Sequence, residues 1–130
     1  MRNCCVEEHN AGGVLVRAHE LNSILVQTSV FQHNLRSGVH ILGAKNKARV
    51  QRNRIEHTRG PALVLDICSS ATVHRNDLDR NRLGILSLGC SPTITFNRVT
   101  RNREDGIRTQ SFQGYGYILF FYSYFFRCYA

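Results

Sequence analysis

The chain has 130 residues, enough for one domain, and its 17 Lys and Arg against 9 Asp and Glu give a net charge of +8. That balance favours an acidic partner, whether nucleic acid, an anionic polysaccharide or an acidic protein surface. The five Cys form no C-x-x-C pair, and the N-terminal stretch lacks the apolar core of a secretory signal. These features exclude zinc-ribbon and thioredoxin-like sites and predict a reducing compartment, the cytoplasm or the nucleus.

Short strands are expected to recur along the chain at a nearly fixed interval. A small residue followed by an aliphatic one stands at Gly13, Gly38, Ala62, Gly84 and Gly106, in steps of 25, 24, 22 and 22 residues. Apolar and polar residues alternate within runs such as GVHI and ITFN, which is the period of a half-buried strand. These repeats predict an all-β fold, a right-handed parallel β-helix of nearly five coils stacked about 4.8 Å apart.

Asparagine recurs at two positions of each unit. The predicted ladder residues are Asn34, Asn53, Asn76, Asn81, Asn97 and Asn102. Asn tolerates left-handed backbone at turns, and stacked amides can bond from coil to coil, so we expect both roles here. The glycines before the strands are expected to supply conformational freedom where the chain turns.

The repeats end near residue 113, where the composition changes. We predict β-helix repeats over residues 1–113, as a fragment of a longer solenoid, and a separate aromatic tail over residues 114–130. The apolar run within 117–126 is too short to span a bilayer. The tail is interpreted as a cap on the last coil or as a non-native end.

The repeat I-x-x-N-x-V-x-x-N-x-x-x-G-I over residues 10–110 resembles the parallel β-helix repeats of carbohydrate-binding and sugar-hydrolase type domains. Such repeats occur in pectin-degrading enzymes, in a periplasmic copper-assembly protein and in the β-helical F-box proteins. The resemblance to the last group implies substrate-recognition repeats of a ubiquitin-ligase adaptor. Nothing in residues 1–130 resembles the helical F-box, so contact with a ligase scaffold is expected only through a longer parent chain.

Catalysis and metal binding find no support in the sequence. Asp77 lies beside an Asn position, but neighbouring units carry Arg54 and Arg98 there, which predicts ion pairing across coils. His33 and His57 share a position that continues as Arg80 and Arg101, and these side chains are expected to be solvated turn residues or a grip for an acidic ligand. We expect no enzyme activity, no cofactor and no metal.

Cys68 and Cys90 occupy equivalent positions in successive units. Adjacent coils would bring the two sulfurs near enough for a disulfide. In a reducing compartment we instead expect both to be small buried apolar residues.

Arginine gathers around the Asn positions and gives the candidate binding site. The predicted contact residues are Arg52, Arg75, Arg80, Arg82, Arg101 and Arg103. Stacked guanidinium groups can recognise carboxylates or phosphates, so the predicted partner is an acidic or phosphorylated protein. Nucleic acid is disfavoured because no aromatic platform is found among these cations before residue 110.

Two other interpretations stay open. One is a carbohydrate-binding or polysaccharide lyase-like β-helix, which would need acids and cations along one groove. The other is a purely structural repeat fragment, in which the Arg stems cover apolar surface.

Overall fold

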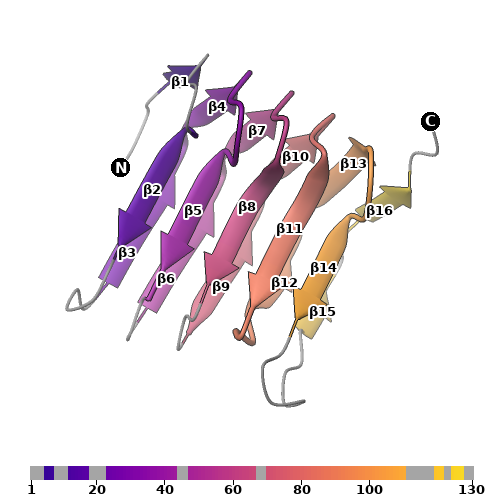
Figure 1. The fold of residues 1–130 in the computed structure, drawn as a ribbon. Helices are drawn as coiled ribbons and strands as arrows, with labels where there is room; N and C mark the ends of the chain where they lie inside the picture. The colour runs from indigo at the N-terminus through magenta and orange to yellow at the C-terminus, as the bar shows by residue number, and fades with distance from the viewer. Residues whose placement is uncertain are drawn as a thin grey trace.

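The computed structural model describes the backbone of residues 5–7, 12–17, 23–43, 47–66, 70–110, 119–121 and 124–127, and the side chains within 12–16, 23–43, 47–66 and 70–110. All regular structure in these ranges is β-strand, and the strands pair in parallel in three sheets. Each circuit of the chain adds one strand to every sheet, so that equivalent strands of successive coils lie side by side (Figure 1). The predicted parallel β-solenoid is confirmed.

We call the sheets I, II and III in the order in which the chain visits them after residue 22. Sheet I contains β3 (Ser23–Gln27), β6 (Lys47–Gln51), β9 (Ala71–His74), β12 (Thr93–Thr95) and β15 (Leu119–Phe121). Sheet II contains β1 (Cys5–Glu7), β4 (Val30–Gln32), β7 (Arg54–Glu56), β10 (Asp77–Asp79), β13 (Arg98–Asn102) and β16 (Tyr124–Arg127). Sheet III contains β2 (Val14–Arg17), β5 (Val39–Leu42), β8 (Pro61–Asp66), β11 (Leu83–Leu88) and β14 (Ile107–Gln110).

The backbone of β15 and β16 lies within the predicted aromatic tail. β15 pairs with β12, and β16 pairs with β13. Whether this segment is a cap or a non-native end stays a prediction.

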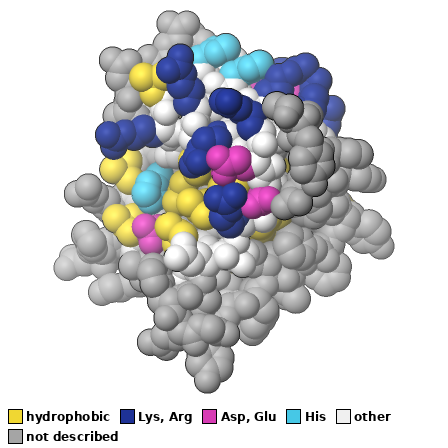
Figure 2. Space-filling model, turned by 45° about the vertical axis from the view of Figure 1, so that its right-hand side comes forward, with side chains coloured by type: hydrophobic (Ala, Val, Ile, Leu, Met, Phe, Trp, Pro, Cys, Tyr) yellow, Lys and Arg dark blue, Asp and Glu magenta, His cyan; other side chains and the backbone are white. Residues whose placement is uncertain are grey.

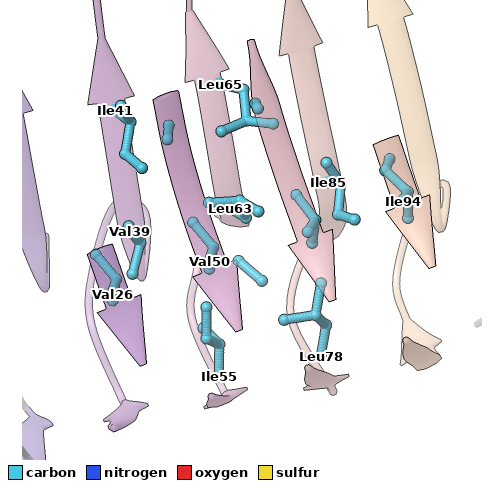
Figure 3. Close-up of a cluster of buried hydrophobic side chains, with 14 of the residues drawn as sticks. Val26, Val39, Ile41, Val50, Ile55, Leu63, Leu65, Leu78, Ile85 and Ile94 are labelled. Carbon is cyan, nitrogen blue, oxygen red and sulfur yellow. The ribbon is translucent and has the colours of Figure 1, made fainter. Parts of the chain in front are cut away.

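The core consists of aliphatic columns inside the coils. In sheet III, Val39 pairs with Leu63 and Leu63 with Ile85, and all three are fully buried. Phe31, Ile55, Leu78 and Val99 form the inward column of sheet II. Figure 3 shows labelled members of both columns, among them Val39, Leu63 and Leu78, projecting into the space between the sheets. Alternation in the sequence thus arises because every second strand residue faces this interior.

Two buried Asn ladders connect the coils, as predicted. In the first ladder, the side-chain amide of Asn53 donates to Asn76 Oδ1 at 3.1 Å, and that of Asn76 donates to Asn97 Oδ1 at 3.0 Å. In the second, Asn81 Oδ1 accepts bonds from the backbone N–H of Thr58 at 3.1 Å and from its hydroxyl at 2.8 Å. Backbone groups at the coil corners are therefore satisfied in the dry interior by the side chains of the next coil.

The predicted left-handed conformation of Asn is wrong. The non-glycine residues with positive φ are Thr28, His33, Arg52, His57, Arg75, Arg80, Phe96 and Arg101, with φ between 52° and 55°. Each of them directly precedes a ladder residue, all eight are exposed, and the ladder residues are all buried. The left-handed residue turns the chain at each corner. The side chain of the residue that follows is therefore buried, where it can hydrogen-bond to the backbone.

The predicted role of the glycines before the strands also needs correction, because the described backbone has positive-φ glycines at Gly43 and Gly89 only. Gly38 and Gly84 are required for another reason. A Cβ at Gly38 would overlap the Ile55 side chain and the Ala62 carbonyl, and one at Gly84 would overlap Val99 and the Gly106 carbonyl. Close packing between sheets II and III, rather than turn conformation, explains these two glycines.

Candidate functional site

Two rows of exposed side chains flank sheet II, one at each end of its short strands. The first corner, between sheets I and II, consists of Thr28, Arg52, Arg75 and Phe96. The second corner, between sheets II and III, consists of His33, His57, Arg80 and Arg101. Successive members of a row come from successive coils, so they are separated by about one strand spacing, 4.8 Å.

The second corner is electrically compensated by Asp79, which is 6% exposed. Arg101 donates to both of its oxygens, from Nε to Oδ1 at 2.8 Å and from Nη2 to Oδ2 at 2.6 Å. Arg80 Nη1 lies 3.1 Å from Oδ2, and the Thr100 hydroxyl donates to Oδ1 at 2.8 Å. Burial alone would raise the pKa of Asp79, but the hydrogen bonds from Arg101 and Thr100 and the two Arg charges hold it below its ordinary value.

The imidazole rings at the second corner stack. The rings of His33 and His57 are 5.1 Å apart and 9° from parallel. This arrangement confirms that the two histidines share one position on adjacent coils, in line with Arg80 and Arg101. Whether the row contacts an acidic ligand stays a prediction.

The first corner has no such compensation. Among the described residues, neither Arg52 nor Arg75 has an ion-pair partner. The nearby acids are engaged by other cations: Arg54 Nη2 is 3.0 Å from Glu56 Oε2, and Arg98 Nη1 is 3.7 Å from Asp77 Oδ2. The predicted pairing of Asp77 across coils is therefore confirmed with Arg98, whereas Arg54 pairs within its own strand.

A shallow groove of about 530 Å³ follows the first corner. Its lining comes from the turns and strands of four neighbouring coils, and includes Thr28, Arg52, Arg75, Phe96 and Arg98. The field of the two unpaired cations reaches the adjacent sheet: burial, followed by the charges of Arg75 and Arg52, lowers the pKa of His74 below its ordinary value. The groove is therefore a cationic surface on which an anion would replace a missing counter-charge.

Phe96 is a site residue that the sequence interpretation missed. Its side chain is 49% exposed, and its ring meets the His74 ring edge-on, with centroids 5.5 Å apart at an angle of 83°. Phe96 stands directly before the ladder residue Asn97, as Arg75 stands before Asn76, and that alignment was the signal available in the sequence. The sequence indicated no aromatic platform among the cations before residue 110, and Phe96 adds one exposed ring there; the prediction about nucleic acid stays a prediction.

The other two predicted contact residues lie beyond the second corner. Arg82 Nη1 is 2.9 Å from Glu104 Oε1, so its charge is partly neutralised. Arg103 is exposed and forms no ion pair within the described ranges. The six predicted arginines thus occupy three separate places rather than one continuous strip.

A second groove, of about 580 Å³, lies on the outer face of sheet III. Apolar side chains of Leu15, Val64, Leu86 and Leu88 line it together with Arg36 and Arg59. Figure 2 shows a face of the molecule on which hydrophobic and basic side chains lie together in this manner. His40 contributes to the lining, and its Nε2 is 3.7 Å from Asp66 Oδ2.

Within the part of the chain that the structure describes, no three His, Cys, Asp or Glu residues are grouped so that they could hold a metal ion. The described segments also contain no helix long and apolar enough to cross a membrane. Cys90 is buried, with Sγ 3.5 Å from the Leu88 carbonyl oxygen. Cys68 falls outside the described residues, so the predicted relation of the two sulfurs is untested.

The architecture agrees with the family comparison. The model of the family described as right handed beta helix region matches residues 1–126, nearly the whole chain. The chain belongs to this family. No curated protein and no solved structure shows a significant match to it.

Proposed function

We propose that this chain is a protein-binding β-helix module whose first corner binds an acidic or phosphorylated segment of a partner protein. One observation carries the proposal: Arg52 and Arg75 are exposed on adjacent coils, and neither has a counter-charge among the described residues. By contrast, each of the described acids has a basic side chain within 4 Å, which is His40 for Asp66 and an arginine for the others; these acids are Glu56, Asp66, Asp77, Asp79, Glu104 and Asp105.

The charge of this face supports an anionic ligand. Among the described side chains, the two corners and strands β4, β7, β10 and β13 of sheet II carry six arginines and three acids, which leaves 6 − 3 = +3. The arginines are Arg52, Arg54, Arg75, Arg80, Arg98 and Arg101, and the acids are Glu56, Asp77 and Asp79. A phosphate group carries about −1.5 to −2 charges at neutral pH and accepts several hydrogen bonds. Two arginines on adjacent coils, whose backbones are about 4.8 Å apart, can direct both guanidinium groups to one such group.

The finer proposal follows from the resemblance to the β-helical F-box proteins. There the coils would serve as the substrate-recognition repeats of a ubiquitin-ligase adaptor in the cytoplasm or nucleus. The ligase scaffold would be engaged by another part of a longer parent chain. The module would then contribute substrate capture and no catalysis of its own.

The proposal is tested by titrating the chain with a fluorescent phosphopeptide and a peptide in which Glu replaces the phosphorylated residue. The double variant Arg52→Ala and Arg75→Ala should weaken phosphopeptide binding by about tenfold or more, as expected for lost charge-assisted bonds of about 1.5–3 kcal/mol each. The matched control is Arg36→Ala with Arg59→Ala. It removes two equally exposed cations without an ion-pair partner in the described structure, and it should change the affinity by less than twofold.

Equal losses in the two double variants would contradict a specific site, because they would indicate binding through net charge alone. A polyuronate oligosaccharide serves as the competing ligand. If it bound more tightly than either peptide and the Arg52/Arg75 variant abolished that binding, the carbohydrate-binding alternative would replace the protein-binding one.

A further inference from the structure

We propose that the first corner selects phosphotyrosine over other phosphorylated residues, with Phe96 receiving the tyrosine ring and Arg75 and Arg52 receiving the phosphate. This inference rests on the proposed function, because it names the ligand class of the same groove. It is carried by the order of side chains along the corner and by the exposure of Phe96.

The corner row places an aromatic ring beside Arg75 and Arg52, the two corner cations that have no ion-pair partner among the described residues. The backbone N–H of Arg52 bonds the His74 carbonyl, and that of Arg75 bonds the Thr95 carbonyl, which fixes successive corner residues one coil apart. Phe96 follows Arg75 in the next coil and lines the same groove. The edge-on contact with His74 holds the ring, while about half of the side chain stays exposed.

The backbone of the turn does not require a phenylalanine at this position. The first coil has Thr28 in the equivalent place, so the turn itself needs no aromatic side chain. A bulky residue at positive φ, 55° for Phe96, is conformationally unfavourable. A ligand ring stacked on the exposed part of Phe96 would contribute about 0.5–1.5 kcal/mol beyond simple burial.

The spacing of the row fits an aromatic phosphate. Adjacent coils are separated by about 4.8 Å, and the phosphate of phosphotyrosine lies at a comparable distance from its ring centre. A tyrosine ring on Phe96 therefore places the phosphate at Arg75, with Arg52 one coil further along. Phosphoserine has no ring to contact Phe96, and it would gain only the two cations.

Asp77 helps to define where the anion lies. It lines the groove on the sheet II side and is drawn toward Arg98 at 3.7 Å. Its negative charge disfavours a phosphate over the middle of sheet II. The anion is thus directed to the corner, where it meets Arg75 and Arg52.

The test compares two peptides that differ only in the phosphorylated residue, phosphotyrosine or phosphoserine, by isothermal titration of the whole chain. The informative variant is Phe96→Thr, because threonine already occupies the equivalent corner position at residue 28. We expect the chain to prefer the phosphotyrosine peptide by at least fivefold. Phe96→Thr should lower the affinity for that peptide by about 2- to 12-fold and leave the affinity for the phosphoserine peptide unchanged.

Equal affinities for the two peptides, with Phe96→Thr silent, would overturn the phosphotyrosine inference. The proposed function would survive that result if Arg52→Ala with Arg75→Ala still weakened both peptides. Both ideas would fail if the double Arg variant bound the peptides as well as the parent chain. A single-stranded oligonucleotide that bound more tightly than phosphotyrosine, and lost affinity in Phe96→Thr, would overturn the inference in favour of nucleic acid.

Discussion

The two corners of sheet II share a backbone but differ in electrostatics. Both turn through a left-handed residue, and both are followed by a buried ladder residue. At the second corner, Asp79 binds Arg101 and Arg80. At the first corner, Asp77 is drawn to Arg98, and the described residues give Arg75 and Arg52 no counter-ion. The backbone of both corners points the corner residue outward. An acidic residue on the neighbouring strand then determines whether the charge of that corner residue is neutralised.

The largest effect is expected for the ladders, because they create both corners. Replacing Asn76 with Ala leaves the N–H of Asn53 and the carbonyl of Val50 buried without their partners. Each orphaned group costs about 1–3 kcal/mol, so the free energy of unfolding should fall by about 2–6 kcal/mol. Urea unfolding followed by circular dichroism measures this change. The control is the exposed corner substitution Thr28→Ala, for which we expect less than about 0.5 kcal/mol.

Asn81→Ala tests whether the second ladder behaves in the same way. Asn81 Oδ1 accepts bonds from Thr58, and its amide donates to the Ile55 carbonyl. We expect a loss of similar size. A loss below about 0.5 kcal/mol, the range of ordinary surface substitutions, would show that water satisfies these groups and that the second ladder is dispensable.

The ladders were predictable from the sequence, whereas the corners were not. Asn53, Asn76 and Asn97 share one chemistry that the buried turn demands, so they repeat visibly. The residues before them only need to turn the chain outward, and Thr28, Arg52 and Phe96 therefore have nothing in common that a repeat search detects. The ion pairs were less predictable still. Asp77 and Asp79 both project outward from β10, and only side-chain reach decides that one engages Arg101 and the other lies near Arg98.

Asp79→Asn is designed to make the second corner resemble the first. It removes the carboxylate that binds Arg101 and Arg80, so both guanidinium groups lose this counter-charge. Because the two Arg side chains are nearly half exposed, solvent screening limits the stability cost to about 1 kcal/mol. Phosphopeptide titration should reveal a gain in affinity of a few-fold. Unchanged affinity would show that exposed arginines at a corner are insufficient for binding.

The same carboxylate makes part of the stability depend on pH. The pKa of Asp79 in the folded chain lies below its ordinary value of 3.8. A depressed carboxyl pKa contributes stability that is fully present above the unfolded pKa and is lost as the pH falls through the folded pKa. The difference in unfolding free energy between the parent chain and Asp79→Asn should therefore be constant near neutral pH and shrink below about pH 3.8. A difference that grew on acidification would contradict the ion-pair assignment.

The smallest expected effect is a change in the pKa of His74, whose ring contacts Phe96 of the first corner. Burial and the charges of Arg75 and Arg52 lower the pKa of His74. Arg52→Ala with Arg75→Ala removes the two charges and keeps the burial, so the pKa should rise toward 6.5 without reaching it. Titration of the His74 ring by NMR measures the change, and Arg36→Ala with Arg59→Ala is the control that should leave it unaltered. A bound phosphopeptide should raise the same pKa in the parent chain, because an anion at Arg75 cancels the positive field. A peptide that binds without moving the His74 titration would bind elsewhere on the coil.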